Sequence, residues 1–500
     1  MFLSAFQAIR DYGLEARSDS ALWEAAIQGL VRQIGDPYAT VFTPEAYDEF
    51  QEENTGSYAG IGVQITSLND AITVTAVFRS TPAERAGVQV GDLIIGVDGE
   101  STEGWTTDDA SRRIRGPVGT AVDVTFARPG VAAPIALEIT RDSVHVSAVT
   151  ADRIGEIGYI ALDRVARSSA REIDSALVML SDARGIVLDL RGNPGGYLDE
   201  SLMMADLFLD RGLKLASLKS RTPGRAELGT QEEWHSRWAP RVPGKPIVVL
   251  VDRFSASAAE IVAGALQDHD RALILGERTF GKGIVQSDIV LTEGRHLRLT
   301  TGEWFTPLGR SLHRPRDQQG RLRPEEEGHA GTFTTAAGRT LSGDGGILPD
   351  IAIEADTLTL REREFLTAAA QAGVPLTLRI EEFAFGEAER LREAGEAPSL
   401  DEAAFQGLVD TLRQEGVPAE LLADAGVLAY LRWRARVRVA ERMERLGVAM
   451  RFRTERDPVL ARALELLREA EDQRDLFAAA ERARKEGPAE RVGAEGSGRR

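Results

Sequence analysis

A serine-containing turn is the first place in this chain where catalytic chemistry is expected. Residues 252–260 join a predicted buried strand to a predicted helix. At such a turn a hydroxyl group rises from the strand end, while the first amides of the helix point at the same spot and could stabilise an oxyanion. Ser257 is therefore a candidate nucleophile and Ala258 a candidate amide donor. A second interpretation stays open, because Ser257 with Glu260 three residues later also forms a capping box.

A lysine between two glycines is the candidate base for that hydroxyl. The chain has no cysteine and only six scattered histidines, so a buried neutral lysine is the remaining common choice. Arginine cannot replace it, because the guanidinium group stays charged. Lys282 lies within residues 276–286, and Gln286 follows four residues later, on the same face of either a helix or a strand. The Gln286 amide could then hold the amine, although Lys282 could equally be a solvated cation in a turn.

Two glycine-rich loops complete the candidate site. Residues 192–196 follow a predicted strand, and the amide of Gly195 is expected close to a substrate oxyanion because glycine allows the main chain to approach closely. Residues 56–63 enter another predicted strand, and their amides could form a nest for the terminal carboxylate of a peptide that adds a strand to the sheet. The predicted carboxylate-binding residues are Gly60, Ile61 and Gly62. No Gly-Lys-Ser/Thr follows, which disfavours a phosphate-binding loop.

The elements that position these residues follow from the hydrophobic pattern. From residue 155 strands alternate with helices, which is typical of an α/β domain. Between residues 56 and 142, short alternating segments punctuated by glycine predict a small β domain. The first fifty residues predict helix. Beyond residue 356 the composition shifts to Ala, Glu, Arg and Leu, and apolar residues step by three and four, which predicts further helices.

Composition limits the classes of function. The 500 residues carry 60 Lys and Arg against 78 Asp and Glu, a net charge of −18, which argues against a nucleic-acid partner. The absence of cysteine excludes disulfides and cysteine-ligated zinc, and we expect no metal and no cofactor. No apolar run approaches the ~20 residues of a membrane-spanning helix, and the first residues contain no signal peptide.

Taken together and in order, these segments resemble the carboxyl-terminal processing proteases, also called tail-specific proteases, which are Ser-Lys peptidases carrying a PDZ domain. The similarity covers most of residues 1–355. Its motifs are residues 35–40, 60–62, 86–92, 114–120, 188–196, 255–260, 276–286 and 346–350. Two positions depart from the family pattern: Tyr38 stands where the family has histidine, and Ala259 replaces a frequent serine. Neither belongs to the catalytic set that the resemblance implies.

The resemblance implies an α/β crotonase-like protease core with an inserted PDZ β-domain. The expected organisation is an N-terminal helical segment (1–54), the PDZ domain (55–142), the Ser-Lys protease core (143–355), an α-helical C-terminal extension (356–486) and a disordered tail (487–500). The role of the C-terminal extension is not implied by the family.

The resemblance also implies a function, that of a serine endopeptidase that recognises unstructured C-terminal tails through its PDZ domain. Cleavage would pass through a Ser257 acyl-enzyme, with Lys282 as general base and Gln286 as its partner. Its partners would be polypeptides with free C-termini, with an adaptor protein or a homo-oligomer also compatible.

Family members are exported, so a periplasmic or extracytoplasmic location is expected, while the lack of a signal peptide leaves the cytoplasm or an upstream start open. The alternative function is a catalytically silent PDZ scaffold or adaptor on a protease fold. A crotonase-like acyl-CoA enzyme would fit the fold but not the PDZ domain or the serine-lysine pair.

Overall fold

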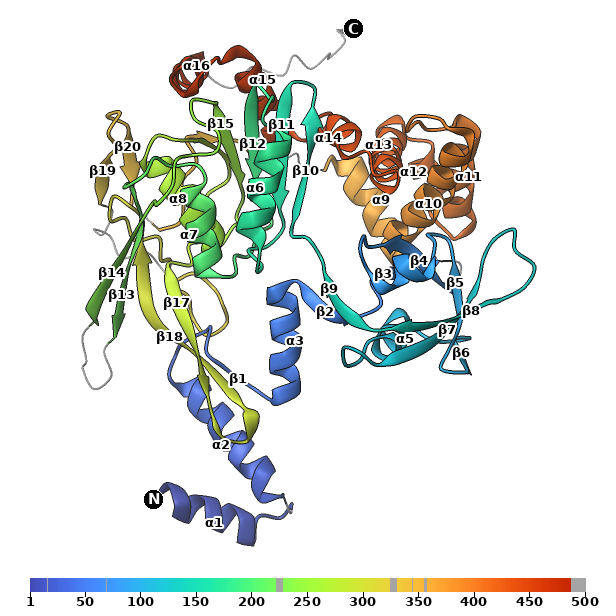
Figure 1. The fold of residues 1–500 in the computed structure, drawn as a ribbon, viewed down its shortest axis with the longest axis horizontal. Coiled ribbons are helices and arrows are strands. Elements are labelled where there is room, and N and C mark those ends of the chain that lie inside the picture. The colour runs from blue at the N-terminus through green and yellow to red at the C-terminus, as the bar shows by residue number, and fades with distance from the viewer. Residues whose placement is uncertain are drawn as a thin grey trace, which may run out of the picture. The chain divides into compact units, whose positions relative to one another are not determined.

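The computed structural model describes residues 1–15, 17–68, 70–221, 228–323, 331–343, 345–354 and 358–486. The expected boundary at 355–356 and the expected tail, 487–500, lie outside these residues. The chain divides into two compact units, each made of separate segments. The first comprises Met1–Thr55, Ala161–Ile353 and Leu466–Arg500, and the second comprises Gly56–Ile160 and Glu354–Glu465. Figure 1 follows the chain through its labelled elements.

A parallel sheet forms the centre of the first unit. Four strands lie in the order β12-β15-β16-β21, and their three pairings are parallel. Their bounds are Gly185–Asp189, Ile247–Val251, Leu273–Gly276 and Ile351–Ala352. Every residue of the first three strands is buried. Continuous Ile, Val and Leu runs suit a sheet that is buried on both faces, and the sequence predicts three of these strands.

Three helices accompany this sheet, namely α6 (Ser169–Met179), α7 (Leu198–Asp206) and α8 (Ala258–Asp268). All eleven residues of α8 are buried, so it is the most enclosed helix of the three. The hydrophobic pattern predicts this helix over residues 256–267, and it begins two residues later because Ser257 has a non-helical conformation.

A second, antiparallel sheet of the first unit lies in the order β1-β18-β13-β14, with β17 paired to β18. Its strands are Thr40–Phe42, His296–Phe305, Lys214–Arg221, Leu228–His235 and Ile284–Val290. The sequence analysis did not predict the long hairpin of β17 and β18. That hairpin has few fully buried residues and mixed polarity, so its alternation is weak.

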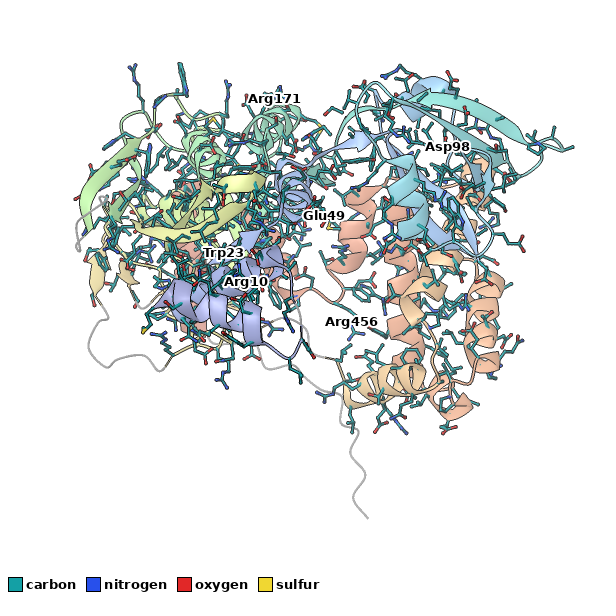
Figure 2. All side chains as sticks on the ribbon, turned by 90° about the horizontal axis from the view of Figure 1, so that it is seen from below. Arg10, Trp23, Glu49, Asp98, Arg171 and Arg456 are labelled. Atoms are coloured by element: carbon teal, nitrogen blue, oxygen red, sulfur yellow. The ribbon has the colours of Figure 1, made fainter. Side chains whose placement is uncertain are left out.

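Three helices precede and follow β1 in the first unit: α1 (Phe2–Tyr12), α2 (Asp19–Gln33) and α3 (Pro44–Thr55). No residue of α1 is buried. The rings of Phe2 and Phe6 lie against Trp23 of α2, with centroids 5.7 and 4.5 Å away, and Trp23 is labelled in Figure 2. The turn at residues 35–38 lies between α2 and β1.

The second unit contains the small β domain that the sequence predicts. Its antiparallel sheet has the order β3-β4-β5-β7-β8, with β6 on β5. The strands are Val63–Leu68, Ala71–Val77, Leu93–Val97, Ala121–Ala127, Ile135–Thr140 and Glu100–Ser101. Helices α4 (Pro82–Ala86) and α5 (Thr107–Ile114) occur where they were predicted. Strand β2 (Ser57–Gly60) pairs separately with β9 (Asp142–His145), and β10 (Val149–Ile154) and β11 (Ile157–Leu162) follow.

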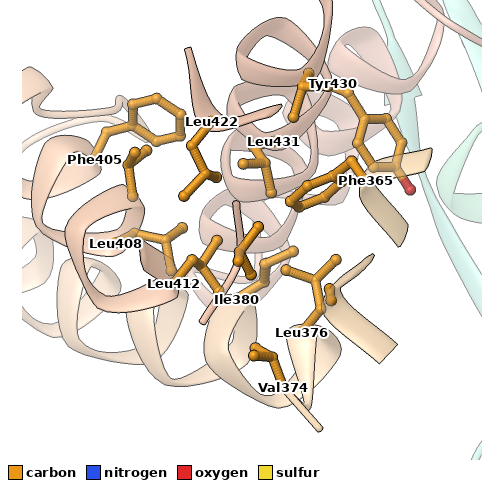
Figure 3. Close-up of a cluster of buried hydrophobic side chains, with 14 residues drawn as sticks. Phe365, Val374, Leu376, Ile380, Phe405, Leu408, Leu412, Leu422, Tyr430 and Leu431 are labelled. Atoms are coloured by element: carbon orange, nitrogen blue, oxygen red, sulfur yellow. The ribbon is translucent and has the colours of Figure 1, made fainter. Parts of the chain in front are cut away.

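Helices make up the rest of the second unit. They are α9 (Leu360–Gln371), α10 (Leu376–Ala394), α11 (Glu402–Gln414), α12 (Ala419–Leu422), α13 (Ala425–Arg442) and α14 (Leu446–Arg453). Figure 3 shows their apolar core, in which Phe365, Phe405 and Leu431 are at most 1% exposed. Three residues of the predicted apolar stripe, Leu431, Ala435 and Val439, are buried in α13. Two more, Leu428 and Met443, are half-buried, and the last, Leu446, begins α14.

The end of the helical region belongs to the first unit. Helix α15 (Pro458–Glu469) spans the division and α16 (Gln473–Glu486) follows it. The side-chain oxygen of Gln473 accepts a hydrogen bond of 2.8 Å from the amide of Ile247, at the start of β15. The region expected to form one extension is therefore divided between the two units. No helix in the described ranges has the length and apolar character needed to cross a membrane.

Candidate active site

The two serines of the 252–260 turn have different surroundings. Ser255 is 1% exposed, and its Oγ donates a 2.8 Å hydrogen bond to the carbonyl of Leu190 and accepts one from the amide of Asp252. Ser257 has φ 54° and ψ −116°, a conformation that costs free energy for a residue with a side chain and that clusters at functional sites. Ser255 therefore holds the turn in place, and Ser257 is the residue that the turn presents.

Glu260, predicted only as a capping residue, joins the serine and lysine segments. Its side chain is 0% exposed. One carboxylate oxygen accepts the amides of both Ser257 and Lys282, each at 2.8 Å. The other accepts the amide of Gly281 at 2.8 Å and the hydroxyl of Thr279. Because two amides share one oxygen, the backbones of Ser257 and Lys282 lie no more than two hydrogen-bond lengths apart.

The Glu260 carboxyl is subject to two opposing effects. Burial raises its pKa, whereas the four donors from Thr279, Lys282, Gly281 and Ser257 act in the opposite direction. All four bonds are donated to the carboxylate, so none of them requires a proton on Glu260. The Glu260 carboxylate thus accepts hydrogen bonds from four donors and holds their segments together.

The predicted lysine and glutamine are in contact. The Nζ of Lys282 donates to Oε1 of Gln286, the third residue of β17, at 2.9 Å. Burial lowers the pKa of Lys282 to about 8, and the charge of Arg298 acts in the same direction while Asp36 and Glu260 oppose it. A lysine with this pKa is partly neutral near physiological pH, as a general base must be.

A turn that the sequence analysis left out of the catalytic set holds the glutamine. The Nε2 of Gln286 donates a 2.7 Å hydrogen bond to the carbonyl of Tyr38, and Lys282 Nζ lies 4.8 Å from the centre of the Tyr38 ring. Asp36 accepts the amides of Tyr38 at 2.9 Å and of Thr300 in β18 at 3.1 Å. The Tyr38 carbonyl therefore decides which end of the Gln286 amide faces the lysine. The motif at residues 35–40 was the signal in the sequence that could have found this turn. It was not assigned a role because none of its residues suggested a chemical one.

The loop at residues 192–196 lies against the nucleophile turn. A Cβ atom on Gly195, whose φ is +96°, would lie 2.8 Å from Ser257 Cβ and 2.9 Å from the amide nitrogen of Ala258. Only glycine fits there. The Gly195 amide, however, donates to Oδ1 of Asn193 at 2.8 Å, so the predicted donor is already paired. Across the described residues, the amides of Gly196 and Ala258 have no such partner.

The predicted carboxylate-binding loop has the arrangement of a nest within the second unit. The carbonyl of Ile61 accepts the amide of Ala83 at 2.8 Å, and that of Gly62 accepts the amide of Phe78 at 3.0 Å. The amides of Ile61 and Gly62 are unpaired within the part of the chain that the structure describes. Gly62 has φ +89°, and a Cβ there would overlap Thr81. Gly60 ends β2 and pairs with Asp142 of β9.

Comparison with known proteins identifies the family of this chain. The family model for peptidase family S41 matches residues 156–319, and a PDZ-domain model matches residues 73–128. The carboxy-terminal-processing protease of Bartonella bacilliformis is 37% identical over 317 residues, which are 62% of this chain and 71% of that protein. This chain belongs to the S41 carboxy-terminal-processing proteases. Membership makes it a serine-type peptidase by family.

Two further relatives illustrate the extent of the similarity to other S41 proteases. Carboxy-terminal processing protease CtpA of Bacillus subtilis is 34% identical over 313 residues, 62% of this chain and 66% of its own length. Among solved structures, the photosystem II D1 C-terminal processing protease is 26% identical, with a TM-score of 0.37, over 70% of this chain and 92% of that one. The matches thus span about two thirds of the curated relatives.

Metal ions in proteins are held by sets of ligating side chains. Within the residues that the structure describes, no group of three or more His, Asp or Glu side chains is placed to hold a metal ion. Ser257 and Lys282 share the Glu260 carboxylate through their backbone amides, and the Lys282 amine contacts the Gln286 amide. A hydroxyl, an amine and nearby backbone amides are groups that suit acyl transfer.

Proposed function

We propose that this chain is a serine endopeptidase that cleaves unstructured polypeptides carrying free C-termini, with Ser257 as nucleophile and Lys282 as general base. The observation that carries the proposal is the shared Glu260 oxygen, which fixes the amides of both residues. The pKa of Lys282, lowered to about 8 by burial, supports the role of base. A crotonase-like description of the core and an extracytoplasmic setting are part of the same proposal.

Acylation would begin at the serine hydroxyl. Neutral Lys282 removes the proton from Ser257 Oγ as the oxygen attacks the scissile carbonyl carbon, and the carbonyl oxygen becomes an oxyanion. The free amides of Gly196 and Ala258 are the proposed donors to this oxyanion, in place of Gly195. As the C–N bond breaks, the Lys282 ammonium returns the proton to the leaving amine.

Deacylation would use the same groups in reverse. Lys282, neutral again, takes a proton from a water molecule that attacks the ester of Ser257, and the ammonium then protonates the serine oxygen as the acid product leaves. Gln286 supports both steps, because its Oε1 accepts from the amine without adding a negative charge that would hold the lysine protonated.

Tail recognition is assigned to the PDZ domain. The free amides of Ile61 and Gly62 form the proposed nest for a terminal carboxylate, and β3 ends its sheet, so one of its edges is available for an added strand. Amidating the C-terminus of a peptide substrate should therefore weaken its binding.

The test is proteolysis of a denatured protein by the purified full chain. The wild type should release fragments, whereas Ser257→Ala and Lys282→Arg should release none. Lys219→Arg is the matched control, since Lys219 is an exposed residue of β13, and it should behave as wild type. Unchanged proteolysis in Ser257→Ala would refute the assignment. A wild type that binds tails but never cuts them would favour the silent scaffold.

A further inference from the structure

A groove in the second unit is not used by the proposed chemistry. It encloses about 630 Å³ between the end of α9, the start of α10, α13 and strand β3 of the PDZ domain. Val374 and Leu376 contribute apolar surface, and Thr66 is the lining residue from β3. The groove therefore combines an apolar floor with the edge strand to which the tail is proposed to bind.

Three arginines on one face of α13 make this groove positive. Arg434, Arg438 and Arg442 are spaced by four residues and all line it, against a single lining carboxylate, Glu381. These lining side chains carry a net charge of +2 in a chain whose net charge is −18. A concentrated positive site on an acidic protein favours an acidic ligand.

The three arginines differ in their contacts with neighbouring carboxylates. Arg438 Nε lies 2.8 Å from Glu381, and its Nη1 lies 2.8 Å from Glu441. Arg442 also pairs with Glu381. The contact found for Arg434 with a neighbouring polar side chain is a long one, 3.5 Å to the hydroxyl of Thr377. Arg434 is therefore the guanidinium best able to bind an acidic group of a ligand.

The N-terminal end of α10 adds to the positive potential of the groove. No side chain caps this 19-residue helix, and no acidic residue occupies its first turn. The amides of Thr377 and Leu378, both lining residues, have no partner in the described part of the chain. The positive end of the helix dipole adds to the arginines.

The groove is continuous with the edge of β3. Thr66 lies on the sheet face opposite Val63 and Ile65, which pack on the domain core. Next to Thr66, the carbonyl of Thr75 in β4 accepts a 3.2 Å hydrogen bond from Arg442. Helix α13 is thus attached to the outer face of this sheet at the groove.

The register of an added strand brings the tail to this groove. A tail whose carboxylate lies at Gly62 and runs antiparallel to β3 would have the residue about four positions upstream beside Thr66, because paired strands advance together. Side chains alternate between the two faces. Every second upstream side chain would then point to the face that carries Thr66 and the arginines.

We propose that this groove extends the tail-binding strip of the PDZ domain and selects acidic residues about five to seven positions from the C-terminus of the substrate. The occupant is an unstructured acidic polypeptide tail, and the inference rests on the proposed recognition of tails by β3. It gives part of the helical extension a role in choosing substrates.

Peptide binding to the full chain carrying Ser257→Ala, which prevents cleavage, tests this inference. Three fluorescent ten-residue peptides share their last four residues and carry Asp, Ser or Lys at the fifth to seventh positions from the end. At low salt the acidic peptide should bind roughly 3- to 10-fold more tightly than the neutral one. Arg434→Glu should abolish this preference without changing affinity for the neutral peptide. Arg413→Glu, an exposed change on α11, should keep it.

The outcomes separate this inference from the proposed function. Equal affinity for the three peptides, with amidation still weakening binding, would overturn the groove inference and leave tail recognition standing. An acidic preference together with affinities that amidation leaves unchanged would overturn recognition of the terminal carboxylate and, with it, the continuity of the two sites. Binding of anionic lipid vesicles through Arg434, with no preference among peptides, would assign the groove to a membrane surface and also overturn the inference.

Discussion

Gln286→Glu is the substitution that most directly probes how the base is kept neutral. The change replaces the oxygen that lies 2.9 Å from Lys282 Nζ by a carboxylate of the same size. An opposite charge at this distance favours the ammonium form and raises a lysine pKa by about 1 to 3 units. Starting from a pKa of about 8 for Lys282, the variant would have a pKa of about 9 to 11.

The expected loss of activity follows from the fraction of neutral lysine. With a pKa of about 8, roughly one tenth of the Lys282 amine is neutral at pH 7. Each added unit lowers that fraction about tenfold, so kcat/KM at pH 7 should fall roughly 10- to 1,000-fold. The activity of the wild type should rise with pH and reach half its plateau near pH 8. The variant should need a pH about 1 to 3 units higher to reach half its own plateau.

The assay is kcat/KM for a soluble peptide between pH 6 and 11, which reports ionisations of the free enzyme. Gln286→Met is the matched control, because it removes the contacts to Lys282 and Tyr38 without adding charge. Its absolute rate should fall, but its rising limb should not move to higher pH. A Gln286→Glu profile that coincides with that of the wild type would refute the reasoning that the neutral amide keeps Lys282 a base.

Four further substitutions distinguish the roles of neighbouring groups. Ser257→Ala should abolish hydrolysis without lowering the melting temperature. Ser255→Ala should keep the chemistry but lose about 1 to 3 kcal/mol of stability, since the Asp252 amide loses its acceptor and the Leu190 carbonyl loses one of its two donors, the other being the Asn193 amide. Calorimetry and activity in parallel check both, and the reverse pattern would contradict the choice of serine. Lys282→Arg should be inactive at every pH, because guanidinium stays protonated, and activity at high pH would argue against a base. Glu260→Gln should lower both stability and kcat, because its NH₂ group would face two donors; a variant stable and active as wild type would mean that the shared oxygen does not position the pair.

The candidate catalytic residues could be proposed from the sequence because they lie in short motifs with a fixed spacing. Lys282 and Gln286 are four residues apart and meet directly, and a turn between a buried strand and a helix located Ser257. The role of Glu260 was not readable, because its other partners, the Thr279 hydroxyl and two backbone amides, lie about twenty residues away in the sequence. The sequence also did not reveal that the side chain of Asn193 accepts the Gly195 amide, which was predicted to face an oxyanion.

The fold, too, could be predicted only in part from the sequence. Buried strands of the parallel sheet were predicted because continuous apolar runs are specific to them. The β17–β18 hairpin was missed because its exposed residues give no clear alternation. The division of the C-terminal helices between two units could not be foreseen. The apolar stripe of a helix predicts that this face is buried, but it does not show which domain buries it.

The attachment of α16 to β15 has a consequence for the order in which the protein can mature. Gln473 reaches the amide of Ile247, so the central sheet of the first unit obtains a hydrogen-bond partner more than two hundred residues after its strand has been synthesised. The first unit is assembled from three stretches of chain, and the second from two. Domains normally fold in turn as they leave the ribosome, but here the segments of the two units alternate along the chain, and the second unit ends before the last segment of the first begins. The framework that carries Ser257 and Lys282 therefore gains this contact only after residue 473 has been translated, long after both residues themselves.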